Sequence, residues 1–558
     1  MEKIKPKLFS VLKTYTKEQL IKDIIAGIIV AIIALPLSIA LALASGVGPE
    51  KGLYTAIIGG FVISFLGGSR VQISGPTAAF ATIVAGIVAT SGMDGLIVAT
   101  IMAGILLILM GMLRLGNLIK FIPYTITTGF TAGIAITIAI GQIKDFLGLT
   151  YPAGTATIET SQKVSAMFHY FTTINIQALL VGAVCLVILI IWPLIGMKIK
   201  GTAGKLFNSI PPSLLAVLVG IFMVSGLHME VNTIGSLYEI SNKLPTLHFP
   251  ALSLSMIRNQ LGNAITIAVL ASIESLLSCV VADSMINSRH RSNTELIAQG
   301  VGNICSGLFG GIPATGAIAR TAANIKNGGR TPIAGMVHAV TLLLILVVLM
   351  PYAALIPMPA IAAILFMVAY NMSGWRQFWA LLRTSPKSDI AVLLTTFILT
   401  VVFDLVVAIE VGIVMAAILF MKRMSDVTQV EGWRYLEDED NDPEAIELRA
   451  VPAHTVVYEI SGPMFFAAAD KILQISIQDS TQNVILRMRS VNAIDATAMH
   501  SLEQLFTKCR KKNVHLIFSH VNEQPMSVMR KAGFDEKVGK DLFCAHIDEA
   551  LQKADDLQ

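Results

Sequence analysis

Two short stretches of the sequence have the residue types of an anion-binding site. Ser74–Phe80 has the sequence Ser-Gly-Pro-Thr-Ala-Ala-Phe, and Pro313–Thr321 has the sequence Pro-Ala-Thr-Gly-Ala-Ile-Ala-Arg-Thr. Each follows a glycine-rich bend and begins an apolar, helix-like run that is too short to cross a bilayer alone. The start of a helix has up to four backbone N–H groups without partners and about half a positive elementary charge. Two such starts facing one cavity would bind an anion without needing a buried lysine or arginine.

The residues expected to contact the anion are small, carry a hydroxyl group or are positively charged. They are Ser74, Thr77, Ala78, Thr315, Gly316, Ala317 and Arg320. The hydroxyl groups would donate hydrogen bonds, and the small residues would let the ligand approach the backbone. The alternative is that both stretches are only kinked, closely packed helices. Arg320 could attract the anion, or it could neutralise a buried acid and support the fold.

Glu274 is the candidate for coupling transport to a second ion. It lies between the apolar runs Ile265–Ile273 and Leu276–Val281, where an ionised side chain is costly unless it is partnered or faces a cavity. Ser278 follows one helical turn later on the same face. We interpret Glu274, with Ser278, as a coupling group for a proton or another cation. The alternative is a static partner for a backbone or arginine group.

No other motif in the sequence indicates chemistry. The five cysteines form no CxxC pair and no metal spacing, and there is no Walker A loop or GxGxxG motif. We therefore expect no catalytic residues, no metal site, no cofactor and no enzymatic activity, and we do not expect ATP to drive the protein.

The composition indicates a membrane protein. Hydrophobic residues make up 54% of the chain and charged residues 14%, and the mean hydropathy is +0.70. These values exclude an ordinary soluble globular protein. Apolar runs recur from about Asp23 to Phe420 and predict fourteen segments in the lipid bilayer, after a basic amino terminus at residues 1–22. The net charge of +4 is better explained by orientation in the membrane than by a nucleic-acid partner.

The basic residues predict the orientation of these segments. If the basic amino terminus is cytoplasmic, the even-numbered connections hold most of the lysines and arginines between segments, including Arg376 and Arg383. The positive-inside rule then places both termini in the cytoplasm of a multi-pass protein. We expect this membrane to be the bacterial cytoplasmic (inner) membrane.

The two interrupted stretches belong to an internal repeat. Ile122-Pro123 before one apolar run recurs as Ile356-Pro357 before another, at nearly the same offset that relates the two stretches. Repeats at about 23–226 and 261–424 would each contain seven segments. Because seven is odd, the two halves must have opposite orientations, and such inverted repeats place a substrate site at the midplane between them. The transport domain is thus predicted to span residues 23–424.

The remainder of the chain has a different character. An acidic, proline-containing linker is expected at 425–445. From 446 to 558, short β-like runs alternate with helical patterns, which predicts a small cytoplasmic α/β domain. At the start of one of these helices, Asp495 is expected to act as a helix cap.

Four motifs resemble those of the SulP anion transporters (solute carrier family 26). They are Gly52–Ala56, Ser74–Thr77, Glu274–Leu277 and Ala319–Thr321, and the tail resembles the STAS domain of that family. The resemblance covers nearly the whole chain. It implies a seven-plus-seven inverted repeat with a mobile core and a gate, and a substrate held between the third and tenth segments. It also implies secondary transport and a homodimer, and it leaves room for a cytosolic protein partner of the STAS domain.

Within this family, the sequence is most similar to a bacterial C4-dicarboxylic acid transporter. The similarity lies in Gly67–Arg70, Gln142–Leu149 and Phe465–Ala469. It implies proton-coupled symport of C4-dicarboxylates such as succinate, fumarate and aspartate by alternating access. The alternatives are a sulfate or bicarbonate transporter coupled to H⁺ or Na⁺, an anion channel, and a sensor that no longer transports.

Overall fold

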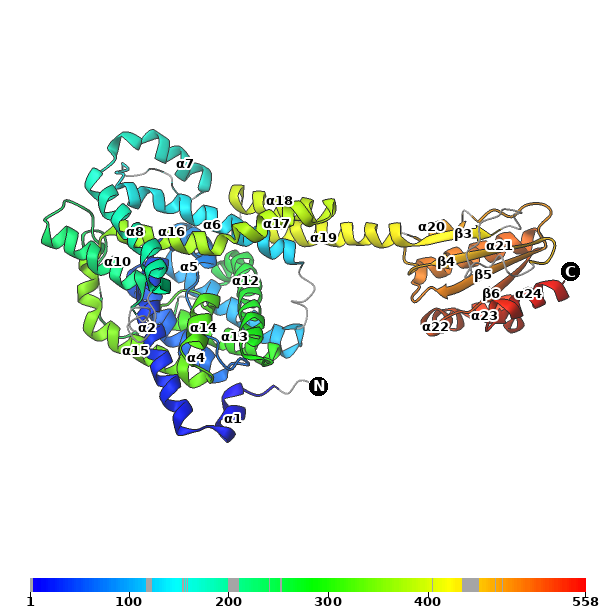
Figure 1. The fold of residues 1–558 in the computed structure, drawn as a ribbon, viewed down its shortest axis with the longest axis horizontal. Helices are drawn as coiled ribbons and strands as arrows, with labels where there is room; N and C mark the ends of the chain where they lie inside the picture. Colours follow the sequence, from blue (N-terminus) through cyan, green and yellow to red (C-terminus); the bar gives the residue numbers. More distant parts are fainter. Residues whose placement is uncertain are drawn as a thin grey trace. The chain divides into compact units, whose positions relative to one another are not determined.

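The computed structural model describes two compact units, Met1–Ile413 and Val414–Gln558 (Figure 1). The described residues are 4–116, 123–152, 155, 157, 159–198, 210–239, 241–250, 253–403, 405–433, 451–466, 468–473 and 475–557. Predictions that concern residues 1–3, Ile122, residues 434–450 and Ala467 lie outside this part of the chain. The bounds predicted for the linker and the two domains stay predictions.

The first half of the first unit is helical. Its helices are α1 (Lys7–Val11), α2 (Lys17–Ala44), α3 (Pro49–Tyr54), α4 (Gly60–Leu66), α5 (Ala78–Met112), α6 (Tyr124–Leu147), α7 (Thr160–His169), α8 (Ile176–Lys198) and α10 (Pro212–Ile221). A π-helical turn at Thr55–Gly59 joins α3 to α4. Helix α5 contains two of the predicted segments, which meet at Gly92. The left-handed φ of 66° at Gly92 breaks the helical backbone there, and glycine adopts such an angle without strain.

The second half repeats this pattern after the short helix α11 (Ile234–Leu237). Its helices are α12 (Leu254–Ile286), α13 (Ser292–Leu308), α14 (Ile318–Lys326), α15 (Pro332–Leu349), α16 (Met358–Ser373), α17 (Trp375–Thr384), α18 (Lys387–Val402) and α19 (Leu405–Val427). Among the described residues, seven helical stretches are long and apolar enough to cross a membrane. The other predicted segments are shorter or interrupted.

The two halves meet at the two interrupted stretches. Strands β1 (Ser74–Gly75) and β2 (Thr315–Gly316) form an antiparallel pair in which Ser74 faces Gly316 and Gly75 faces Thr315. Helix α2 packs against α15, and its counterpart α12 packs against α5. These two contacts are equivalent under the internal repeat, because exchanging the two halves of the chain converts one contact into the other. The antiparallel strands agree with opposite orientations of the halves.

The helices of the first unit form two bundles. Helices α2, α4, α5, α12, α13, α14 and α15 pack against one another, while α6, α8, α10, α16 and α18 form the second bundle. The first bundle contains both interrupted stretches. This division corresponds to the core and the gate that the family resemblance implied.

Gly52 allows α3 to approach α2 closely. A Cβ atom at this position would overlap the backbone carbonyl oxygen of Ser38. The Gly52→Ala variant is therefore expected to force the two helices apart and lower the free energy of unfolding by roughly 1–3 kcal/mol. The thermal unfolding midpoint of the purified protein measures this loss. Gly86→Ala is the matched control, because no atom lies within 4 Å of a Cβ there. Equal midpoints for the two variants would contradict the prediction.

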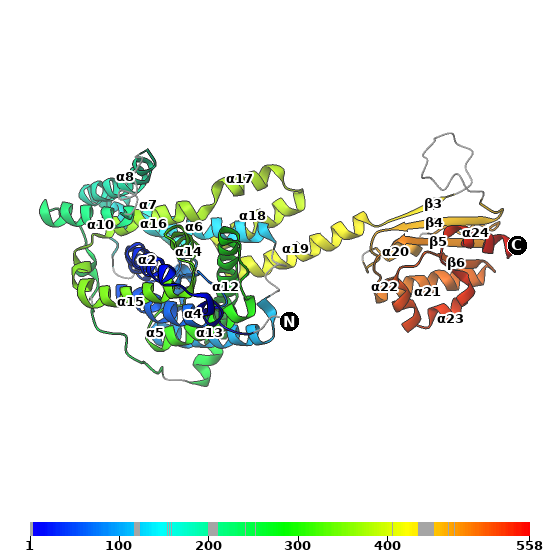
Figure 2. The ribbon, with the colours of Figure 1, turned by 60° about the horizontal axis from the view of Figure 1, so that its bottom comes forward.

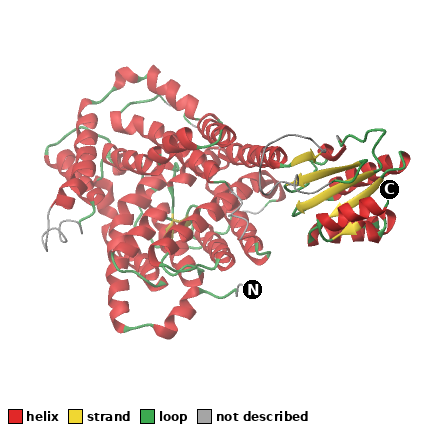
Figure 3. Ribbon diagram, turned by 45° about the vertical axis from the view of Figure 1, so that its right-hand side comes forward, coloured by secondary structure: helices red, strands yellow, loops and turns green. Residues whose placement is uncertain are grey.

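The second unit contains a five-stranded sheet. Its strands β3 (Gln429–Trp433), β4 (Thr455–Ser461), β5 (Asn483–Ser490), β6 (His515–Ser519) and β7 (Phe543–Cys544) lie in that order. The β3–β4 pair is antiparallel, and the following pairs are parallel. Figure 3 shows this sheet in yellow among the helices of the unit. The predicted α/β domain is confirmed.

Helices cover both faces of this sheet. They are α20 (Asp470–Leu473), α21 (Ala496–Lys511), α22 (Glu523–Lys531), α23 (Phe534–Val538) and α24 (Ile547–Asp556). Helices α21, α22 and α23 lie on one face and α24 on the other (Figure 2). Leu486 and Phe518 belong to the core on the first face, and Ile485 and Ile517 to the core beneath α24. Parallel strands that are buried on both faces in this way have nearly continuous apolar sequences.

Candidate substrate site

The starts of α5 and α14 converge at the β1–β2 pair. Thr77 is the residue before α5 and Ala317 is the residue before α14, and neither side chain caps the helix that follows it. The backbone N–H groups at both helix starts therefore have no side-chain cap. Ala78 and Ala317 are small and buried, as expected for a wall that a ligand approaches closely. The two uncapped starts favour negative charge between them.

The structure brings Thr77 and Glu274 into contact. The hydroxyl group of Thr77 donates a hydrogen bond of 2.8 Å to Oε2 of Glu274, which reaches across from α12. Both side chains are half-buried. Ser278, one turn further along α12, is buried, and its hydroxyl oxygen has no hydrogen-bond partner among the described residues. The predicted coupling carboxylate thus lies directly beside the start of α5. We call the part of α5 before Gly92 and helix α14 the two half-helices, because each begins at one of the interrupted stretches.

Thr315 and Gly316 contact α12 through Ser275. The hydroxyl oxygens of Thr315 and Ser275 are 2.6 Å apart, and the Gly316 N–H donates to the Ser275 hydroxyl over 3.1 Å. A direct contact between these groups and an anion would require Ser275 to release them. Ser275 was not among the site residues predicted from the sequence. The signal was present, because Ser272, Ser275 and Ser278 recur at every third residue of an apolar helix.

Arg320 joins the two halves. Its side chain is 3% exposed, and its Nη2 donates to the backbone carbonyl of Pro76. Its Nη1 lies beside Gly75, where a Cβ would collide with it, and has no hydrogen-bond partner among the described residues. Within the same residues, neither Glu274 nor another carboxylate forms an ion pair with Arg320. A buried positive charge in this situation is costly unless a counter-ion is bound.

A ladder of polar residues on α13 holds the turns that precede the half-helices. Glu295, Gln299 and Asn303 follow one another at every fourth residue, so they lie on one face of the helix. The Glu295 carboxylate accepts hydrogen bonds from the backbone N–H groups of Gly68 and Ser69 and from the side chains of Gln72 and Gln299. The Gln299 amide also donates to the hydroxyl of Ser74 over 3.3 Å. The regular spacing in the sequence could have revealed this ladder.

Asn303 holds the backbone directly before β2. Its side chain accepts from the Ala314 N–H over 2.8 Å and donates to the Ala314 carbonyl over 2.9 Å. The Asn303→Leu variant would leave both buried backbone groups without partners, each at a cost of about 1–3 kcal/mol. We expect a lower unfolding midpoint together with weaker anion binding, measured by thermal unfolding and calorimetry.

A matched control for this prediction is Thr100→Val. The Thr100 hydroxyl is also buried, but it only donates back to the Leu96 carbonyl of its own helix. Its removal is expected to change the unfolding midpoint and the affinity little. If both variants retain the affinity and stability of the unmodified protein, Asn303 does not position the second half-helix.

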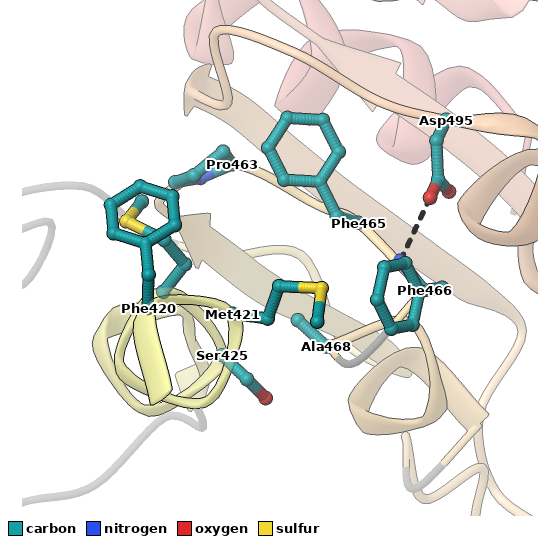
Figure 4. A pocket seen from close by; sticks show the side chains of 9 residues that line it. Phe420, Met421, Ser425, Pro463, Phe465, Phe466, Ala468 and Asp495 are labelled. Atoms are coloured by element: carbon teal, nitrogen blue, oxygen red, sulfur yellow. Dashed lines mark hydrogen bonds between the residues drawn. The ribbon is translucent and has the colours of Figure 1, made fainter. Parts of the chain in front are cut away.

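A separate apolar cavity of about 240 Å³ lies in the second unit (Figure 4). It is lined by Phe420, Met421, Met424, Ser425, Pro463, Phe465, Phe466, Ala468 and Asp495. Asp495 accepts hydrogen bonds from the backbone N–H groups of Phe466 and of Ala498, which lies in the first turn of α21. Asp495 is thus a helix cap, as predicted. Within the described residues, no group of three or more histidine, cysteine or acidic side chains could hold a metal ion.

Two half-helices that meet at paired strands, a core and a gate, and a terminal α/β domain define a polytopic transporter of the inverted-repeat class. The chain belongs to the sulfate permease family of anion transporters, whose model matches residues 20–396, and a STAS domain model matches residues 445–554. The fold and family predictions are confirmed at this level.

Two curated relatives span nearly the whole chain. A Bacillus subtilis protein described as "Putative sulfate transporter YvdB" is 39% identical and covers 96% of this chain and 98% of the relative. The "Bicarbonate transporter BicA" of Picosynechococcus is 31% identical and covers 95% of this chain and 94% of the relative. These comparisons do not support the finer prediction of a special similarity to a C4-dicarboxylic acid transporter.

Solved structures have the same fold. A structure of SLC26A9 superposes with a TM-score of 0.87 at 18% identity, covering 99% of this chain and 92% of that chain, which shows the fold alone. The transmembrane domain of a cyanobacterial bicarbonate transporter, BicA, superposes with a TM-score of 0.61 at 29% identity. It covers 72% of this chain and 98% of that chain.

Proposed function

We propose that this protein is a secondary transporter of a small inorganic oxyanion, either sulfate or bicarbonate. The observation that carries the proposal is the buried Nη1 of Arg320, which has no hydrogen-bond partner in the described part of the chain and lies near two uncapped helix starts. A bound oxyanion would supply the missing counter-charge and accept hydrogen bonds from the backbone. The names of the two curated relatives favour these anions over a C4-dicarboxylate.

Ser74, Thr77, Ala78, Thr315, Gly316, Ala317 and Arg320 form the proposed substrate site. Ala78 and Ala317 form its walls, and Arg320 provides positive charge from beneath Gly75. Ser275 must move or rotate before Thr315 and Gly316 can donate to the anion. Such a rearrangement suits alternating access, in which the site opens to each side of the membrane in turn.

Glu274 is the proposed coupling group, with Ser278 beside it. An ionised Glu274 accepts a hydrogen bond from the Thr77 hydroxyl and so removes that donor from the substrate site. A protonated Glu274 can instead donate a hydrogen bond to the Thr77 oxygen, which lets the Thr77 hydroxyl donate to the anion. Protonation also removes a negative charge that would repel the substrate. The geometry therefore favours binding an anion and a proton together.

A sodium ion is the alternative coupling ion. The carboxylate of Glu274 and the hydroxyl of Ser278 are oxygen ligands one helical turn apart, and the Ser278 hydroxyl has no hydrogen-bond partner within the described ranges. A cation held there would neutralise Glu274 in the same way that a proton does. In both cases the anion would enter as a symport substrate, and the charge beside the half-helix would decide whether it binds.

Proteoliposome uptake distinguishes these possibilities. Labelled sulfate, bicarbonate and succinate are offered in parallel under an inward pH gradient, an inward Na⁺ gradient or no gradient. We expect saturable uptake of sulfate or bicarbonate that one gradient increases, and no competition by succinate. Succinate uptake that excludes the other two anions would overturn the substrate assignment. Anion currents without gradient-driven accumulation would indicate a channel.

The placement in the membrane follows from the same proposal. We place the protein in a bacterial cytoplasmic membrane with both termini in the cytoplasm, supported by the basic residues on the even-numbered connections. We further propose a homodimer with STAS domains that are free to contact a cytosolic protein. Accessibility of single cysteines introduced at the two termini, tested in intact cells, measures the orientation.

A further inference from the structure

Helix α17 is amphipathic and exposes aromatic residues. Gly374, with a left-handed φ of 53°, ends α16 and turns the chain into α17. No residue of α17 is fully buried. Trp375 is 50% exposed and Trp379 is 52% exposed. Figures 1 and 2 both show α17 at the rim of the first unit, next to α18.

One side of α17 contacts the gate, and the other side is exposed, although the Trp375 indole N–H donates to the Tyr370 hydroxyl of α16 over 3.3 Å. Phe378, Leu381 and Leu382 are half-buried, and the Phe378 ring lies 5.2 Å from the Phe397 ring of α18. Trp375 and Trp379 are one turn apart, so they share one side of the helix. Large exposed aromatic side chains of this kind are found where a membrane protein meets the lipid headgroups.

Each exposed tryptophan has an arginine stacked on it. The guanidinium carbon of Arg376 lies 5.4 Å from the centre of the Trp375 ring, and that of Arg383 lies 4.9 Å from the Trp379 ring. The two arginines are seven positions apart in the sequence, so they lie on the same side of the helix about 10 Å apart. Stacking holds the planar guanidinium groups in place while leaving their N–H donors free.

Helix α17 carries positive charge without an acidic residue of its own. Helix α17 contains no aspartate or glutamate. In the described part of the chain, no carboxylate forms an ion pair with Arg376 or Arg383. The helix therefore presents two aligned guanidinium groups and two indole rings on one continuous surface.

We propose that α17 lies in the headgroup layer of the bilayer and binds the phosphate groups of anionic lipids. Guanidinium groups match phosphate oxygens with paired hydrogen bonds, and tryptophan rings fit the boundary between headgroups and acyl chains. The helix directly connects α16 and α18, two predicted membrane segments, so both of its ends are at the bilayer surface. The spacing of the arginines suits two neighbouring phosphates or one lipid that carries two.

A second copy of this chain fits the same surface poorly. In a two-fold symmetric contact through α17, the arginines of one copy would face those of the other, and no acid on the helix could separate them. Anionic lipid has the opposite charge and is already adjacent. Because α16 and α18 both pack against α6, lipid bound at α17 would anchor the gate bundle to the headgroup layer while the core moves.

Quenching of tryptophan fluorescence by brominated lipids tests this assignment in the full-length protein. The other two of the four tryptophans are replaced (Trp192→Phe, Trp433→Phe), so that Trp375 and Trp379 alone report. The protein is reconstituted into bilayers that contain either brominated phosphatidylglycerol or brominated phosphatidylcholine. We expect a relative binding constant that favours the anionic lipid, and it should fall in Arg376→Gln/Arg383→Gln by about five-fold for each arginine.

A control variant separates local binding from general attraction. Lys243→Gln/Arg258→Gln removes two exposed basic residues elsewhere in the first unit and should leave the quenching ratio unchanged. Equal quenching by the two lipids, or an equal fall in both double variants, would overturn the proposal. If quenching is absent and Arg376→Gln/Arg383→Gln changes the oligomeric mass, the surface would instead be assigned to contact with a second copy. Gel filtration confirms that each variant is folded.

Discussion

The Glu274→Gln variant is expected to accumulate the anion under a gradient roughly 100-fold less than the unmodified protein. This factor corresponds to the upper range of coupling free energies between two sites. Glutamine has the shape of the protonated acid and can still donate a hydrogen bond to the Thr77 hydroxyl. The site should therefore keep its affinity for the anion. It can no longer exchange a proton or attract a cation, so the anion is not driven by either gradient.

Two assays in proteoliposomes separate the two effects of this variant. Counterflow of labelled anion against unlabelled anion needs a binding site but no coupling, and we expect it to persist. Accumulation under an imposed pH or Na⁺ gradient should disappear. Glu410→Gln, which changes an exposed acid on α19, should behave like the unmodified protein in both assays. Full accumulation by Glu274→Gln would remove Glu274 from the coupling mechanism.

The Arg320→Gln variant is expected to bind sulfate or bicarbonate roughly 10- to 100-fold more weakly. A charge-assisted hydrogen bond contributes about 1.5–3 kcal/mol, and none of the residues that the structure describes accepts one from Nη1 of Arg320. The free energy of unfolding should change little, because losing the bond to Pro76 is offset by no longer burying an unpaired charge. Calorimetric titration measures the affinity, and thermal unfolding measures the stability.

Arg330 serves as the control, because its Nη1 is hydrogen-bonded to the protein and lies away from the substrate site. Its Nη1 donates to the backbone carbonyls of Ile325 and Gly329 at the far end of α14, away from the helix start. Arg330→Gln should lower the unfolding midpoint and leave anion affinity intact. Arg320 would be a purely structural residue if Arg320→Gln behaved in the same way, with reduced stability and normal binding.

Much of the architecture was predictable because lipid imposes strong constraints. Backbone that leaves the helix within a membrane must contact protein or water, so Gly-Pro and Pro-Ala-Thr-Gly interruptions mark a protected interior site. Glu274 was recognisable for a similar reason, since an acid in an apolar segment needs a partner or a cavity. The preference for a C4-dicarboxylate was not supported by the comparisons. That preference relied on a few short matches outside the site, and such matches carry no information about the size or charge of the ligand.

Four features could be predicted without the structure: the class of protein, the repeat, the two half-helices and the acid beside them. These features follow from hydropathy, charge and local backbone preference, which are properties of neighbouring residues. The folded structure was needed to identify three contacts, namely Thr77 with Glu274, Ser275 with Thr315 and Arg320 with Pro76. Thr77 and Glu274 are 197 positions apart, and helices with apolar residues on all sides do not indicate which face meets which neighbour. Hydrogen-bond partners at such separations are set by the packing of the whole core, so local patterns could name the donors and acceptors but not pair them.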